Sequence, residues 1–322
     1  MLELKAPPRV EQGALEVPLD HPPPEEPLNA RAADVITSST QDLLSLTKPR
    51  LSSLVICTAA GGMWLAHSPE LTAGRTALTL LATAGTVGAA NALNCYLERD
   101  SDRFMARTRS RPLPAGRMEP LVALFFGLSL AAFSIPTLAL SANLLTAALG
   151  LVAFLSYVLL YTPLKSRSPQ AMLVGAIPGA IPPMMGWTAA TGKLDATAWV
   201  LFAILFFWQL PHFIAIAMFR KPEYRAAGLK SVPLASGDGV ARWQMLGYTV
   251  ALVPVSCLLY PLGVAGALYL SVAVVLGAVF LGMTGWGVWR KEGKVWARKV
   301  FLFTLVYLAG LFGALMANGT VR

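Results

Sequence analysis

The sequence predicts an all-α, polytopic integral membrane protein with about nine transmembrane helices around a central cavity that opens to the cytosolic side. The composition points to this class, because 55% of the 322 residues are hydrophobic and only 13% are charged. A soluble domain carries about 25% charged residues, so the composition excludes a nucleic-acid-binding module, a disulfide scaffold and a disordered chain. The apolar segments also lack the alternating pattern of a membrane β-barrel, which leaves helices as the spanning elements.

Nine apolar segments follow the N-terminal region, and each is long enough to cross about 30 Å of hydrocarbon as a helix. Gly175 and Gly179 form a GxxxG pattern in the fifth segment, which we interpret as a close helix contact. The expected spans are residues 51–68, 76–97, 119–138, 142–162, 169–190, 197–219, 244–263, 265–289 and 297–317.

The first 42 residues differ in composition from the rest of the chain. They contain seven prolines and eight acids, and they have no apolar run that would suit a signal peptide. A segment of this kind cannot bury enough apolar surface to fold. We therefore expect residues 1–42 to be a disordered cytosolic tail and residues 43–322 to form the transmembrane domain.

The distribution of basic residues predicts the orientation. With the expected spans, 23 of the 26 lysines and arginines lie on the side of the N-terminus, and three (Arg75, Lys193 and Arg322) lie on the other side. Lysine and arginine concentrate on the cytoplasmic side of membranes. The N-terminus is therefore expected in the cytosol and the C-terminus outside, and the absence of a transit-peptide pattern favours a bacterial plasma (inner) membrane.

Three acids lie within five residues at the cytosolic end of the second span: Glu98, Asp100 and Asp102. On a helix, residues four apart drift by about 40° around the axis, so Asn94, Glu98 and Asp102 share one face. Asp100 lies about 200° from Glu98 on the opposite side. The pattern predicts that Asn94, Glu98 and Asp102 converge on one ligand.

Two carboxylates and an amide form an all-oxygen site of the kind that suits Mg²⁺, which binds one or two carboxylates together with substrate phosphates. The arginines that follow, Arg107, Arg109 and Arg111, can clamp phosphate oxygens. The combination suits a diphosphate. The alternative is an ordinary helix end with interfacial charges and ion pairs.

A second polar cluster lies at the cytosolic end of the sixth span and consists of Trp208-Gln-Leu-Pro-His212 and Arg220-Lys-Pro-Glu-Tyr-Arg-Ala-Ala-Gly228. His212 lies inside an apolar span next to a proline, and an ionisable residue at membrane depth suggests a functional site. The alternative is a neutral histidine that is bonded to a neighbouring carbonyl. Lys165 ends the fourth span on the same side, where it could be a snorkelling anchor or a fixed charge for a phosphate.

Several stretches resemble the UbiA superfamily of intramembrane prenyltransferases. The segment from Asn94 to Pro114 resembles the first aspartate-rich motif of that superfamily. The whole resemblance covers about residues 43–318. Within the superfamily, it is closest to the branch that acts on protoheme. Its motifs are Leu46-Thr-Lys-Pro-Arg50, Tyr161-Thr-Pro-Leu-Lys165-Ser-Arg-Ser-Pro169-Gln, Trp208-Gln-Leu-Pro-His212-Phe and Glu223-Tyr-Arg-Ala-Ala-Gly228.

The resemblance implies roles for individual residues. Asn94, Glu98 and Asp102 match the positions that hold Mg²⁺ and diphosphate, and Glu223 matches a reduced second acidic motif. Trp208, Gln209 and His212 are implied as heme-binding residues. The implied diphosphate contacts are Lys48, Arg50, Arg107, Arg111, Tyr161 and Lys165.

Two positions depart from the pattern of the superfamily. Glu98 stands where aspartate is usual, and its longer side chain could shift a metal ion. Cys95 stands where the branch that acts on quinone precursors has an acid.

The implied activity is transfer of the farnesyl group of farnesyl diphosphate to a vinyl group of protoheme IX (heme B), which gives heme O for terminal oxidase assembly. The implied cofactor is Mg²⁺, and the implied partners are farnesyl diphosphate, heme B, the lipid bilayer and a downstream heme-modifying enzyme or oxidase. The alternatives are a prenyltransferase of the same fold that acts on an aromatic or quinone precursor, and a membrane transporter.

Overall fold

The computed structural model of the protein describes residues 40–66, 68, 72–105 and 108–317, without the side chain of Leu51. The expected tail therefore lies almost entirely outside the described residues. Residues 40–46 form a short helical segment that leads into the first long helix. The prediction for residues 1–39 stays a prediction.

The described part of the chain is helical and contains no β-strand. A helical segment occupies each of the nine expected ranges, and two short helices, α9 (Lys221–Ala226) and α10 (Val232–Ala235), lie between the sixth and the seventh. The longer elements are α2 (Pro49–Leu65), α3 (Ala73–Asp102), α4 (Pro120–Ser141), α5 (Leu144–Leu155) with η1 (Ser156–Tyr161) and α6 (Thr162–Leu164), α7 (Ala171–Thr191), α8 (Ala196–Phe219), α11 (Gly237–Cys257), α12 (Ala267–Trp289) and α13 (Lys294–Ala317).

Among the described residues, six helical segments are long and apolar enough to cross a membrane: α3, α4, the continuous segment Leu144–Leu164, α8, α12 and α13. The all-α membrane fold is therefore confirmed, whereas nine crossings stay a prediction. The other three long helices do not meet these length and hydropathy requirements, and each has a reason in its sequence. α2 has only 17 residues, α7 contains three prolines, and α11 begins with a polar turn that includes Asp238 and Arg242.

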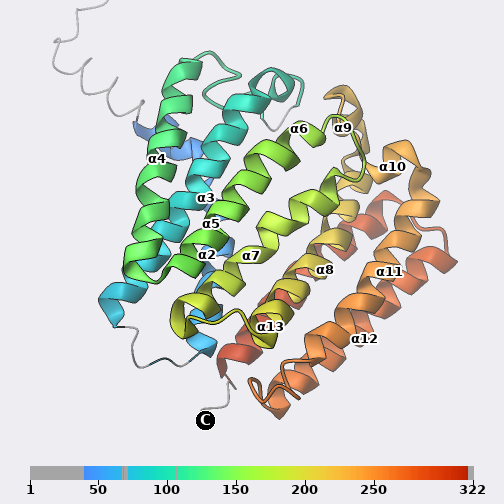
Figure 1. Cartoon of the computed structure of the whole chain (residues 1–322). Helices are drawn as coiled ribbons and strands as arrows, with labels where there is room; N and C mark the ends of the chain where they lie inside the picture. Colours follow the sequence, from blue (N-terminus) through green and yellow to red (C-terminus); the bar gives the residue numbers. More distant parts are fainter. Residues whose placement is uncertain (1–39, 67, 69–71, 106–107, 318–322) are drawn as a thin grey trace, which may run out of the picture. The chain divides into compact units, whose positions relative to one another are not determined.

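The helices pack side by side in an order that follows the sequence (Figure 1). α3 packs against α4, α5 connects α4 to α7, and α7 packs against both α2 and α8. α8 then contacts α11 and α13, and α13 returns to α2. This order brings the N-terminal and C-terminal helices into contact and leaves α7 and α8 in the middle of the bundle.

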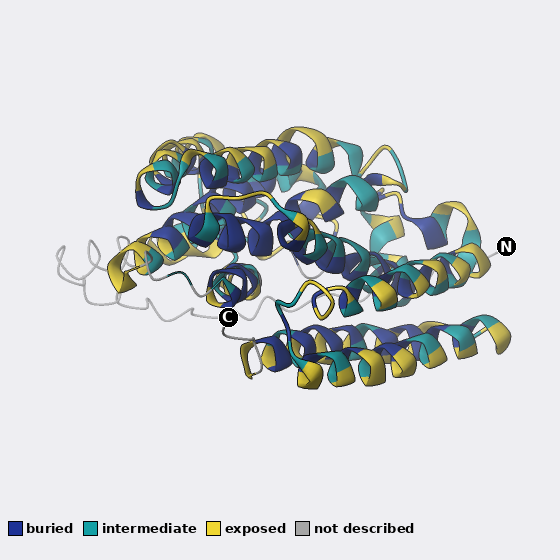
Figure 2. Ribbon diagram, turned by 60° about the horizontal axis from the view of Figure 1, so that its bottom comes forward, coloured by how far each residue is buried: buried dark blue, intermediate teal, exposed yellow. Residues whose placement is uncertain are grey.

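Large apolar side chains also face outward, and exposed residues follow the outer faces of the helices (Figure 2). Phe133, Leu140, Leu144 and Trp289 are each more than 70% exposed. Lipid tails cover such side chains without cost, whereas water would not. The outer surface therefore matches a bilayer environment.

Glycines allow the closest approach of two helices, α2 and α7. A methyl group on Gly62 would collide with the carbonyl oxygen of Pro183, and one on Gly186 would collide with that of Ala59. The GxxxG pair in α7 also lies at close contacts with neighbouring helical segments, η1 and α8. Space beside Gly175 holds the ring of Tyr161, and space beside Gly179 holds the amide of Gln209.

One end of the bundle collects the polar connections. Figure 1 shows the C-terminal end of α3, α6, α9 and α10 at the same end. The main-chain N–H of Lys230 donates to the carbonyl oxygen of Lys165 at 3.2 Å, which joins the segment between α9 and α10 to the end of α6. The expectation that the first and second polar clusters lie at the same end is met.

Candidate functional site

The last three turns of α3 carry the polar face that the spacing predicts. Asn94, Glu98 and Asp102 all lie within the helix, which ends at Asp102. Asn94 is 2% exposed and Asp102 is 4% exposed, whereas Asp100 is fully on the exposed side. The inward side of α3 therefore carries Asn94 and Asp102, and the outward side carries Asp100, as helical geometry predicts.

Each carboxylate of this face is paired with a cation from a different segment. Lys165 Nζ donates to Glu98 Oε1 at 3.1 Å and to Oε2 at 3.3 Å. Arg111 Nη1 donates to Asp102 Oδ2 at 2.6 Å. Partly buried pairs interact more strongly than exposed pairs because water screens them less. Lys165 is therefore a fixed charge in this structure and not a free snorkelling anchor.

The third member of the face, Asn94, joins two further elements. Lys48 Nζ donates to Asn94 Oδ1 at 2.7 Å, and Asn94 Nδ2 donates to Thr162 Oγ1 at 3.3 Å. Loss of water around the Lys48 ammonium lowers its pKa, and the nearby Arg111 and Lys165 act in the same direction. Lys48, Glu98, Asp102, Arg111 and Lys165 thus form one compact group of charges, which we call the acid–cation cluster together with Asn94.

The backbone of Lys48 is strained. Its φ of 50° lies in the left-handed region, which residues with side chains rarely adopt, and Pro49 follows directly. Strain of this kind persists where the surrounding structure holds it, and it is frequent at functional sites. Here it accompanies an ammonium group that points onto the face of α3.

A compact loop after α3 returns Arg111 to Asp102. Thr108 Oγ1 donates to the carbonyl oxygen of Asp102 at 2.8 Å, and the N–H of Arg111 donates to the carbonyl oxygen of Thr108 at 3.0 Å. Thr108 is 1% exposed and Leu113 is 4% exposed, so the loop is packed. Sequence reasoning missed Thr108. Arg107 lies outside the described residues.

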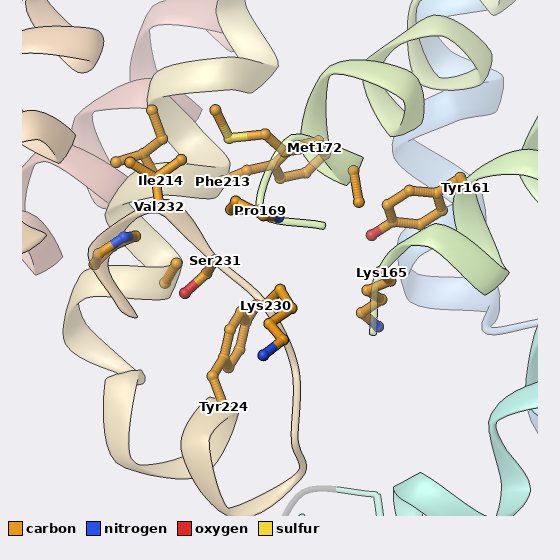
Figure 3. A pocket seen from close by; sticks show the side chains of 13 residues that line it. Tyr161, Lys165, Pro169, Met172, Phe213, Ile214, Tyr224, Lys230, Ser231 and Val232 are labelled. Atoms are coloured by element: carbon orange, nitrogen blue, oxygen red, sulfur yellow. The ribbon is translucent and has the colours of Figure 1, made fainter. Parts of the chain in front are cut away.

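A local irregularity places Tyr161 next to Lys165. The π-helical turn η1 ends at Tyr161. Both the main-chain N–H and the hydroxyl of Thr162 donate hydrogen bonds to the carbonyl oxygen of Tyr157. Pro163 follows and has no N–H for a regular helical bond. Such π turns are frequent at functional sites. Tyr161 and Lys165 both line a pocket whose opposite wall carries Tyr224, Lys230 and Ser231 (Figure 3).

The three residues that the resemblance implies as heme-binding lie at contacts between helices. His212 Nδ1 is 2.7 Å from Thr304 Oγ1, and Trp208 Nε1 donates to the carbonyl oxygen of Thr304 at 2.7 Å. The rings of Trp208 and His212 stack with centroids 5.0 Å apart. Gln209 Nε2 donates to the carbonyl oxygen of Ala176 on α7 at 3.1 Å. Sequence reasoning missed Thr304, whose hydroxyl engages Nδ1, one of the two ring nitrogens of His212.

The two other residues implied by the resemblance are differently placed. Glu223 pairs with Arg220, with Arg220 Nη1 at 2.9 Å from Glu223 Oε1, and its side chain is 33% exposed. Arg50 lies in the first turn of α2 and is exposed. Neither forms a described contact with the acid–cation cluster.

The oxygen atoms of Asn94, Glu98 and Asp102 fit a hard divalent cation. Mg²⁺ commonly takes one or two carboxylates and completes its shell with substrate phosphates and water. Within the described part of the chain, no three His, Cys, Asp or Glu side chains form a metal site by themselves. The face of α3 therefore suits a metal ion that arrives with a diphosphate, and the neighbouring cations suit the same anion.

Comparisons with known proteins find relatives along most of this chain. Residues 54–306 match the model of the UbiA prenyltransferase family. The protoheme IX farnesyltransferase of Myxococcus xanthus (strain DK1622) is 64% identical over 92% of this chain and 100% of its own length. The protoheme IX farnesyltransferase of Anaeromyxobacter sp. (strain Fw109-5) is 53% identical over 89% of this chain and 96% of its own length.

Solved structures share the fold at low sequence identity. A structure described as digeranylgeranylglyceryl phosphate synthase superposes with a TM-score of 0.75 at 18% identity, covering 87% of this chain and 98% of the other. A UbiA homolog from Archaeoglobus fulgidus, bound to GPP and Mg²⁺, superposes with a TM-score of 0.63 at 16% identity, covering 85% and 99%. The family model over residues 54–306 and the relative at 64% identity show that the chain belongs to the UbiA prenyltransferase family, and together with its apolar helices they show that it is an integral membrane protein.

Proposed function

We propose that this chain transfers the farnesyl group of farnesyl diphosphate to a vinyl group of protoheme, with Mg²⁺ as cofactor. The observation that carries the proposal is the 64% identity to a protoheme IX farnesyltransferase along 92% of the chain. The acid–cation cluster supports it, because the cluster offers oxygen ligands for a metal and three cations for a diphosphate within one group of contacts.

The residues of the cluster act on the leaving group. Mg²⁺, when bound, would neutralise charge that builds on the diphosphate as the allylic C–O bond breaks. Lys165, Arg111 and Lys48 would donate charge-assisted hydrogen bonds to the phosphate oxygens. Asn94, Glu98 and Asp102 would hold the metal. The diphosphate leaves with the electron pair of the broken bond.

The acceptor completes the reaction. The terminal carbon of the vinyl group forms a bond to C1 of the farnesyl group, and positive charge develops on the vinyl carbon next to the ring. Water adds to that carbon and releases a proton, which gives a hydroxyalkyl product. The apolar lining of the pocket near Tyr161, with Met172, Phe213 and Ile214, would limit water and reduce early capture of the farnesyl cation.

The first test replaces one proposed metal ligand. Asp102→Asn keeps the size of the side chain and an acceptor for Arg111, but it removes the negative charge. We expect farnesyl transfer to fall by about 100-fold or more, while the detergent-purified protein stays folded. The measurement is the mass of the heme after incubation with heme B, farnesyl diphosphate and Mg²⁺.

The matched control is Asp100→Asn, two residues away on the exposed side of the same helix. This variant should keep the wild-type rate. Full activity of Asp102→Asn, or an equal loss in both variants, would refute the metal-binding role. A wild-type enzyme that forms no farnesylated heme would refute the proposed function as a whole.

His212 is proposed as a heme ligand or orienting group through Nε2, because Thr304 engages the other ring nitrogen. His212→Ala should weaken heme binding, measured by the change in heme absorbance on titration of the purified protein. Phe301→Leu is the control, since Phe301 contacts the same ring with centroids 4.9 Å apart but has no ligating atom. An unchanged heme titration for His212→Ala would remove this role.

We also propose that the polar end of the bundle faces the cytosol of a bacterial inner membrane, with the C-terminus outside. The proposal rests on the 23 of 26 basic residues on the side of the N-terminus. A phosphatase that is active only outside the cytosol, fused after Arg322, should show activity. Activity from a fusion at the N-terminus instead would contradict the orientation.

A further inference from the structure

The pocket beside the acid–cation cluster has two polar walls and an apolar interior. One wall consists of Tyr161 and Lys165, and the facing wall consists of Tyr224, Lys230 and Ser231 (Figure 3). Side chains such as Met172 and Phe213 lie between them. The lining contains two lysines and no acid. A pocket of this kind suits an anionic group carried on an apolar body.

Ser231 carries a polar atom that lacks a partner. The residue is 7% exposed, and its Oγ atom is buried with no hydrogen-bond partner among the described residues. Ser231 precedes α10 but does not use its hydroxyl to cap that helix. A buried hydroxyl without a partner is unfavourable. A ligand oxygen in the pocket would remove that cost.

Lys230 is the second polar group of the same wall, and its side chain is exposed. Three other cations nearby are paired with carboxylates: Lys165 with Glu98, Arg220 with Glu223 and Lys221 with Asp238. The ammonium of Lys230 has no carboxylate partner within the described part of the chain. Its main chain is nevertheless fixed, since its N–H bonds to the carbonyl oxygen of Lys165.

Lys230 and Ser231 line a different part of the structure from the proposed metal ligands. Glu98 and Asp102, the proposed metal ligands, do not line this pocket in the described structure. In the proposed function, the diphosphate and its metal ion lie on the face of α3, and two proposed diphosphate contacts, Tyr161 and Lys165, also line this pocket. The second wall is left for an anion of the other substrate, and it lies across the pocket from Lys165.

We infer that Lys230 and Ser231 bind a carboxylate of the acceptor and so orient the acceptor toward the bound farnesyl diphosphate. The inference rests on the proposed function, in which the acceptor is protoheme. Protoheme is an apolar macrocycle with two propionate carboxylates. Lys230 supplies a charge-assisted hydrogen bond, Ser231 supplies its unpaired O–H, and the apolar lining contacts the edge of the macrocycle.

The test measures KM for each substrate in Lys230→Gln and Ser231→Ala. Relative to wild type, KM for protoheme should rise by about tenfold in Lys230→Gln, the effect of one lost hydrogen bond to a charged group. It should rise less in Ser231→Ala. KM for farnesyl diphosphate should stay unchanged. With protoheme dimethyl ester, which has no free carboxylate, the variants and the wild type should have equal KM values.

Two further variants serve as controls. Lys230→Arg keeps the charge and should retain most of the affinity for protoheme. Lys294→Gln removes an exposed lysine at the start of α13 that does not line the pocket, and it should behave as wild type.

Two results would overturn the inference while leaving the proposed function intact. One is an equal rise of KM for protoheme and its dimethyl ester, which would indicate a packing effect. The other is a rise of KM for farnesyl diphosphate alone, which would assign the pocket to the diphosphate. A wild-type protein that modifies neither acceptor would instead overturn the proposed function, and this inference with it.

Discussion

The pairing of charges at one end of an apolar bundle is the constraint on which the rest of the structure depends. A carboxylate removed from water is unstable unless a cation or hydrogen-bond donors compensate it. Glu98 and Asp102 meet this requirement through Lys165 and Arg111, at 3.1 Å and 2.6 Å. The same pairs keep two cations beside two acids before any substrate arrives. A diphosphate with Mg²⁺ could replace both pairs at once, since it brings an anion for the cations and a cation for the acids.

Local irregularities position the partners of α3. The π turn ending at Tyr161 sets the direction of the segment that carries Thr162 and Lys165, and the absence of a side chain at Gly175 makes room for the Tyr161 ring. Lys48 reaches Asn94 from a strained backbone at the start of α2. A strained backbone lowers the free energy of unfolding, and the packing of the surrounding helices compensates for that loss. The acid–cation cluster is thus assembled largely from the ends of several helices that pack together in the bundle.

Helical periodicity was sufficient to predict the all-α class and the shared face of Asn94, Glu98 and Asp102, because both follow from local sequence. The partners could not be predicted in the same way. Lys165 is 67 positions from Glu98, and its sequence context suits an interfacial anchor equally well. No sequence pattern predicts the unpartnered hydroxyl of Ser231 or the hydrogen bond between Thr304 and His212. Both depend on which helices become neighbours.

The most direct test of the acid–cation cluster is an experimental structure of the full chain with Mg²⁺ and a farnesyl diphosphate analogue whose allylic bond does not ionise. The account predicts Mg²⁺ between the diphosphate and the side chains of Glu98 and Asp102, with Lys165 and Arg111 moved onto phosphate oxygens. A diphosphate bound elsewhere, with the Glu98–Lys165 and Asp102–Arg111 pairs unchanged, would contradict it.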